Sequence, residues 1–267
     1  MIWAFVAALA MVPIGVFLIR PRVAPLFQND FQGIKTEAIV GPMVTLAVFM
    51  SALVIAQATA GYQRAYQSTS SEGSSISLLF EHAGMLPDNA GKDIQAASVC
   101  YARAVTHREF PALANLHTAP EVDHWADQFD LLVPKVLSGP GPIVGQIVAL
   151  NRAQSEARLT RVNEASTNIP TLTIVLMIVA VLAVILALSS LAIKDMRRAV
   201  LVPVALLLAT LLGGSLFLVD QLERPFSGII KVSPSVISNV ARDTGAAFAT
   251  RYPGVALPCD ATGRPTA

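Results

Sequence analysis

Four stretches of the chain are long enough to cross a bilayer and contain no charged residue. They are residues 2–19, 39–59, 169–193 and 199–219. Because the hydrocarbon core of a bilayer is about 30 Å thick, a helix needs roughly 20 apolar residues to span it. The first stretch follows no basic segment and precedes no small-residue cleavage site, so it reads as a retained anchor rather than a signal peptide. The sequence therefore predicts an all-α membrane protein with four transmembrane helices.

The composition excludes several other classes of protein. Hydrophobic residues make up 54% of the chain and charged residues only 14%, whereas an ordinary soluble domain has roughly 25% charged residues. Disorder requires the opposite balance. A net charge of +1 without a basic stripe argues against a nucleic-acid partner. The lipid bilayer is the partner that this composition requires.

The apolar stretches divide the chain into four parts. Residues 1–59 form one transmembrane hairpin, and residues 169–219 form a second. Residues 60–168 between them show mostly helical periodicity and predict a helical cap. A run that begins at Ile143 is expected to continue into the third membrane helix. Residues 220–267 form a C-terminal tail.

The tail is expected to contain one short amphipathic helix. Ser233 supplies a side chain suited to an N-cap, and Pro234 suits the first helical position. Apolar residues recur from Val236 to Phe248. This helix either lies on the membrane surface or docks on the cap. Docking is favoured because its polar face carries Arg242 and Asp243 rather than a row of basic residues. A serine-rich stretch at residues 70–75 reads as a flexible or capping segment.

The distribution of Lys and Arg predicts the orientation in the membrane. The short loops 20–38 and 194–198 carry six of these residues in 24 positions. The flanks on the other side carry five in 49 positions. Cytoplasmic loops are enriched in Lys and Arg, so both termini and the cap are predicted on the non-cytoplasmic side of a plasma membrane.

The chain has two cysteines, and this topology places both on the same side of the membrane. Cys100 lies in the predicted cap and Cys259 in the proline- and glycine-rich tail. If that compartment is oxidising, they can form a disulfide that tethers the tail. The alternative is two unrelated free thiols.

No catalytic, cofactor-binding or metal-binding constellation is evident, so we expect neither an enzyme nor a cofactor. The densest group of potential metal ligands comprises His107, His117, His124, Glu121, Asp123 and Asp127. Its histidines are ten and seven residues apart, without the short spacing of a zinc site. Solvated helix faces explain these residues better.

Charged residues at the outer end of the fourth membrane helix are candidates for ion pairs at the membrane interface. The candidates are Asp220, Glu223, Arg224, Arg158 and Arg161. Anchoring at the water boundary explains them more simply than an ion pathway. No ionisable residue lies inside the four stretches, which argues against a proton-coupled transporter. A passive pore could still be lined by hydroxyl residues such as Thr45, Ser51, Ser189 and Ser190.

Three segments resemble motifs of a widespread bacterial membrane family of unknown function, labelled bestrophin-like. ERPFSGIIKVSP (residues 223–234) is similar to that family's Asp-Arg-Pro-Phe-x-Gly signature, with Glu223 in place of the aspartate. LLFEHAGMLP (residues 78–87), preceded by Glu72, and REFPAL (residues 108–113) resemble two further motifs. The signature residues are Glu223, Arg224, Pro225, Phe226, Gly228, Ser233 and Pro234.

The resemblance implies an oligomeric anion channel, because bestrophins are pentameric anion channels. It also implies a cytoplasmic cap, opposite to the side that the charge distribution predicts. No bestrophin pore, neck or calcium-clasp motif can be matched to this sequence. The alternative function is a non-catalytic scaffold or accessory subunit whose cap binds an envelope protein. The excess of Arg over Lys indicates a GC-rich bacterial source.

Overall fold

The protein is all-α and folds as two compact units, each with an apolar core of its own. The computed structural model describes residues 2–22, 36–86, 89–136, 141–166, 169–191 and 198–266. Within these ranges the single β-type contact is an isolated bridge between Cys259 and Pro265. The membrane unit comprises Met1–Ala60 and Thr167–Glu223, and the cap unit comprises Gly61–Ser166 and Arg224–Ala267. The predicted fold class is confirmed.

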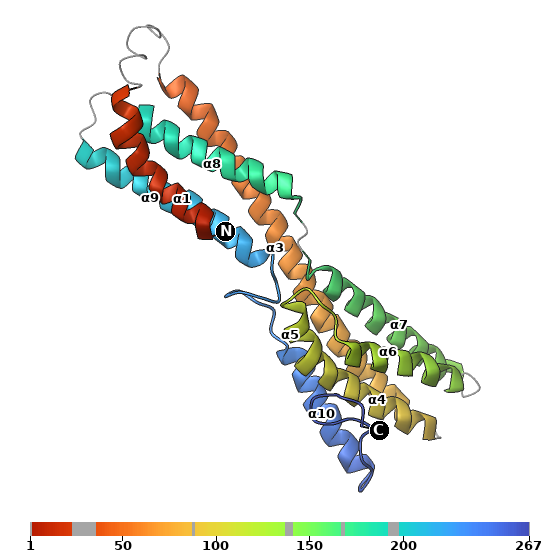
Figure 1. Cartoon of the computed structure of the whole chain (residues 1–267). Helices are drawn as coiled ribbons and strands as arrows, with labels where there is room; N and C mark the ends of the chain where they lie inside the picture. Colours follow the sequence, from red (N-terminus) through yellow and green to blue (C-terminus); the bar gives the residue numbers. More distant parts are fainter. Residues whose placement is uncertain are drawn as a thin grey trace. The chain divides into compact units, whose positions relative to one another are not determined.

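The membrane unit contains the four predicted transmembrane helices (Figure 1). Its elements are α1 (Ile2–Pro13), the π-helical η1 (Ile14–Ile19), the first part of α3 (Thr36–Ala83), α8 (Thr171–Leu191) and α9 (Arg198–Leu222). All four helices are long and apolar enough to cross a membrane. With 48 residues, α3 is about 72 Å long, more than twice the thickness of a bilayer core.

Small residues allow the membrane helices to approach closely. The backbone of η1 lies against α8, and a Cβ atom built on Gly15 would lie 1.9 Å from Ser189 Oγ. Similarly, a Cβ atom on Gly213 of α9 would lie 2.8 Å from the Phe5 ring of α1. Membrane helices rely on such contacts because lipid tails are as apolar as their side chains.

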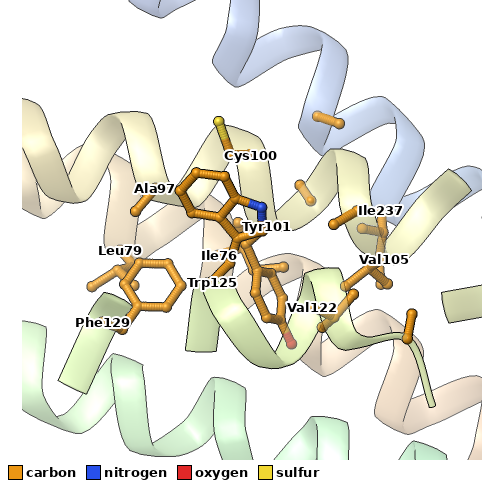
Figure 2. Close-up of a cluster of buried hydrophobic side chains, with 14 of the residues drawn as sticks. Ile76, Leu79, Ala97, Cys100, Tyr101, Val105, Val122, Trp125, Phe129 and Ile237 are labelled. Carbon is orange, nitrogen blue, oxygen red and sulfur yellow. The ribbon is translucent and has the colours of Figure 1, made fainter. Parts of the chain in front are cut away.

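The cap unit combines the remainder of α3 with several shorter helices and α10. These are α4 (Asn89–Ala104), the π-helical η2 (Val105–Glu109), α5 (Phe110–Leu113), α6 (Pro120–Leu132), the 3-10 helix η3 (Val133–Val136), α7 (Gly141–Asn163) and α10 (Ser235–Arg251). Figure 2 shows their apolar core, in which Ile76, Tyr101, Phe129 and Ile237 are at most 1% exposed. Because Ile237 belongs to this core, α10 docks in the cap unit.

The C-terminal tail is bound to the cap unit at several points. Cys100 of α4 and Cys259 of the tail, 159 residues apart, form a disulfide. Trp125 Nε1 of α6 donates a hydrogen bond to the Gly263 carbonyl at 2.7 Å. Gly263 has a φ of +81°, and a Cβ atom there would lie 2.2 Å from the Ala104 nitrogen. The tail is therefore a packed part of the cap.

Three local predictions are wrong. The helix that contains Ile143 does not run into the third membrane helix, since α7 ends at Asn163 and α8 begins at Thr171. Pro170 between them has no N–H group for a continuous helix. The serine-rich residues 70–75 lie inside α3. Pro234 is the N-cap of α10 rather than its first residue, and Ser233 Oγ accepts a hydrogen bond from the Ser235 N–H at 3.2 Å.

Candidate functional site

A fully buried salt bridge joins α3 to α7 inside the cap unit. Arg161 Nε donates to Glu72 Oε2 at 2.6 Å, and its Nη2 donates to Glu72 Oε1 at 3.0 Å. Both side chains are 0% exposed. Two parallel hydrogen bonds between a guanidinium and a carboxylate are among the strongest polar contacts in proteins.

Glu109, the last residue of η2, extends this contact into a network with a second arginine. Its carboxylate accepts a hydrogen bond from Arg161 Nη2 and another, at 2.6 Å, from Arg158 Nη2. Arg158 also donates to Asp123 of α6 at 2.6 Å. We call Glu72, Glu109, Arg158 and Arg161 the buried ion network. Its two carboxylates and two guanidinium groups balance in charge. This balance matters because an unpaired charge is costly to bury.

Aromatic side chains pack beside Arg161 and Glu72 of the buried ion network. The Arg161 guanidinium lies 5.3 Å from the centroid of the Phe110 ring, a distance at which a cation interacts favourably with the ring face. Phe110 packs edge-on against Phe226, with ring centroids 5.5 Å apart. The Tyr101 hydroxyl donates to Glu72 Oε1 at 2.6 Å. The Glu72–Arg161 end of the network is thus fully buried beside aromatic rings, whereas Arg158 is 14% exposed and reaches the exposed Asp123.

The environment keeps Tyr101 neutral and Arg161 charged. Burial raises the pKa of Tyr101 well above its ordinary value, and the nearby Glu72 carboxylate raises it further. For Arg161, burial disfavours the charged form, but Glu72 and Glu109 outweigh this effect and raise the pKa. Neither group titrates near neutral pH, so this site is suited to a permanent structural contact rather than to proton transfer.

The second candidate surface is the exposed side of α3 within the membrane unit. Four exposed residues of α3 follow one another at three- or four-residue spacing: Thr45, Phe49, Ala52 and Ala56. Residues with this spacing lie on one side of a helix. The exposed side of α8 instead carries Leu172, Val175, Leu176 and Val179. This stripe of α3 is uncharged and contains one hydroxyl group and two alanines, and Leu46 and Leu53 are exposed beside it.

The hydroxyl residues that the sequence suggested for a pore occupy different environments. Thr45 is exposed, with its hydroxyl bonded to the Gly41 carbonyl at 3.0 Å. Ser51 and Ser189 are at most 5% exposed, so neither lies on the surface of a single subunit. The side chain of Ser190 lies outside the described residues.

The structure also locates the charged residues expected at the outer end of the fourth helix. Asp220 lies in the last turns of α9, and Glu223 and Arg224 directly follow it. Arg158 and Arg161 were candidates for the same group of ion pairs. Their side-chain hydrogen bonds in the structure go to Glu72, Glu109 and Asp123 of the cap unit.

The signature segment forms a turn between α9 and α10. Gly228 has a φ of +87°, a conformation that favours glycine. The Val232 N–H donates to the Pro225 carbonyl at 2.7 Å and closes the turn. Phe226 of the same segment packs against Phe110, which lies beside the buried ion network.

The histidines and acids that the sequence grouped together have separate roles. Asp123 binds Arg158, and Glu121 lies within 3.8 Å of Arg108 and 3.6 Å of Arg264. His124 packs edge-on against Trp125. Within the described residues, no three His, Cys, Asp or Glu side chains gather as metal ligands would.

Comparisons with known proteins identify one family and one fold. The model of the bestrophin-like domain family matches residues 3–237. A crystal structure of a bacterial bestrophin homologue from Klebsiella pneumoniae is similar, with a TM-score of 0.71 and 11% identity, covering 94% of this chain and 99% of that chain. A point variant of that homologue has a TM-score of 0.72 and 11% identity, covering 92% and 96% of the two chains. No curated protein sequence matches the chain.

Proposed function

Since the chain belongs to the bestrophin-like family, we propose that it forms a homo-oligomeric anion channel in the plasma membrane. The family match is the observation that carries this proposal, because bestrophins are anion channels. Four transmembrane helices are too few to enclose a pore alone, so several subunits are required. The channel needs no catalytic residues, and none of the geometry described above calls for them.

We propose that the exposed side of α3 lines the pore. Thr45, Phe49, Ala52 and Ala56 present small or hydroxyl groups around a bulky ring, and Phe49 is 59% exposed. Apolar constrictions can gate a pore by excluding water, and uncharged walls let an anion pass without trapping it. The Leu- and Val-rich side of α8 is better suited to lipid.

The first test is the mass of the detergent-solubilised protein, by native mass spectrometry, followed by halide flux in liposomes. A closed ring of subunits and a flux that requires the protein are expected. A monomer or dimer in several mild detergents, without flux, would overturn the channel. That outcome would favour a scaffold whose cap binds an envelope partner.

The placement of the pore can be tested by cysteine modification in Ala56→Cys. Because Cys100 and Cys259 are paired, the new thiol is the only one that a methanethiosulfonate reagent can reach. An anionic ethylsulfonate attached there should reduce halide flux by about tenfold or more, since fixed negative charge in a narrow pore repels anions.

The matched control for that experiment is Val179→Cys on the exposed side of α8. Its modification should leave halide flux unchanged, because a lipid-facing side chain does not meet the permeating ion. Equal loss of flux in both variants, or loss only in Val179→Cys, would contradict a pore lined by α3.

We propose that the cap and both termini lie on the non-cytoplasmic side. The Lys and Arg distribution favours this side, and the Cys100–Cys259 disulfide is suited to an oxidising compartment. A membrane-impermeant protease added to intact spheroplasts should cleave within residues 60–168. Protection in intact spheroplasts, with cleavage only after lysis, would place the cap in the cytoplasm.

A further inference from the structure

A cavity of about 700 Å³ lies in the cap unit between α4, α6, α10 and the C-terminal tail. Its size falls within the range of small-molecule sites. It is separate from the buried ion network, since none of the four network residues lines it. It is also separate from the exposed side of α3, so the proposed pore does not account for it.

The floor of the cavity is apolar and aromatic. Trp125 of α6 and Phe248 of α10 contribute to it, together with Ala96 and Ala97 of α4. Trp125 and Phe248 are at most 3% exposed, so their positions are fixed by packing. Only small parts of these rings face the cavity, but this part of its surface is already ordered, so a ligand does not lose binding free energy by fixing these side chains.

The C-terminal tail forms a further wall of the cavity. Pro258, Pro265 and Thr266 of this tail line it, and the Cys100–Cys259 disulfide fixes the same segment to α4. The Trp125–Gly263 hydrogen bond attaches the tail to the floor. Because the wall is held in place before any ligand arrives, binding does not have to order it.

The charged groups at the cavity are predominantly cationic. Lys92 and Lys135 line it, whereas Asp93 is the single carboxylate among its lining residues. Lysine ammonium groups beside an apolar floor are complementary to a molecule with one anionic end and one apolar end. We propose that this cavity binds a small amphipathic organic anion, such as a carboxylate with an aromatic or aliphatic body.

The binding test uses the fluorescence of Trp125. The chain has two tryptophans, so a Trp3→Phe background leaves Trp125 as the single reporter. Titration of this solubilised protein with 4-phenylbutyrate should give a saturable change in emission. The uncharged 4-phenylbutyramide should give a much weaker response, and inorganic phosphate should not displace 4-phenylbutyrate.

Charge variants in the same background test the recognition. Lys92→Gln combined with Lys135→Gln should weaken 4-phenylbutyrate binding by about tenfold, and Asp93→Asn should strengthen it by up to about fivefold. Lys231→Gln, an exposed lysine elsewhere in the cap unit, should have no effect. Reduction of the disulfide should weaken binding by releasing one wall.

Three outcomes would show that the cavity does not bind an amphipathic anion through its lysines, and a fourth would change the ligand class. They are an absence of saturable response, equal responses to the carboxylate and the amide, and binding that the double lysine variant leaves unchanged. Displacement by inorganic phosphate at similar concentrations would show a bare anion site and would overturn the amphipathic class. None of these readouts uses ion flux, so failure of this binding site and failure of the proposed channel can be distinguished.

Discussion

Replacing Arg161 with methionine is expected to lower the unfolding free energy of the cap unit by about 3–5 kcal/mol. Methionine keeps the helix propensity and much of the length of arginine, but it removes the cation from Glu72 and Glu109. Both carboxylates are fully buried, so they keep their desolvation cost while losing their main compensation. In thermal unfolding of the solubilised protein, this corresponds to a decrease in Tm of roughly 10 °C or more.

Arg152→Met is the matched control for this prediction. It makes the same chemical change on the same helix, but the Arg152 and Glu156 side chains are 80% and 62% exposed. Exposed pairs of this kind contribute about 0.3–0.5 kcal/mol, so Tm should change little. Equal stability of Arg161→Met and Arg152→Met would show that the buried ion network does not stabilise the cap unit.

A double-mutant cycle separates the pair from its surroundings. Glu72→Gln combined with Arg161→Met removes the strongest contact and leaves a neutral amide in place of an uncompensated carboxylate. The double variant should therefore be less destabilised than the sum of the two single variants. Additive losses would mean that the two side chains contribute independently, which would contradict the short contacts between them.

The membrane helices could be predicted from the sequence because their signal is local. Each of the four stretches carries its own evidence in an uninterrupted run of apolar residues, and each forms a helix at nearly the predicted position. Reliance on local patterns also explains the wrong prediction that the helix containing Ile143 continues into the third membrane helix. Apolar residues closely follow the helical pattern of α7, and periodicity alone does not reveal the break before Pro170.

The buried ion network could not be predicted in this way. Glu72 and Arg161 are 89 residues apart, and a single sequence contains no signal that pairs them. One clue was available. Glu72 precedes Ile76 and Leu79 by four and seven residues, so it lies on the same side of the helix as these core residues. An acid at a core position requires a partner, but the serine residues around it suggested a loop, since serine favours caps and turns.

The disulfide is the second contact on which the cap should depend strongly. In Cys100→Ser combined with Cys259→Ser, the unfolding free energy is expected to fall by about 2–4 kcal/mol. The crosslink spans 159 residues, a separation for which chain entropy alone predicts a larger effect. However, α8 and α9 lie within that span, and residual helical structure in the unfolded state reduces the entropy that the crosslink removes.

Local release of the tail should be visible before global unfolding. Trp125 is 3% exposed and donates its indole N–H to the Gly263 carbonyl of the tail. In the Trp3→Phe background, the double serine variant should therefore show red-shifted emission, because water reaches the indole when the tail leaves. A reductant should shift the parent protein in the same way and should leave the serine variant unchanged. If neither the emission nor Tm responds, the tail is held by its hydrogen bonds and packing alone, and the disulfide would contribute little to the cap.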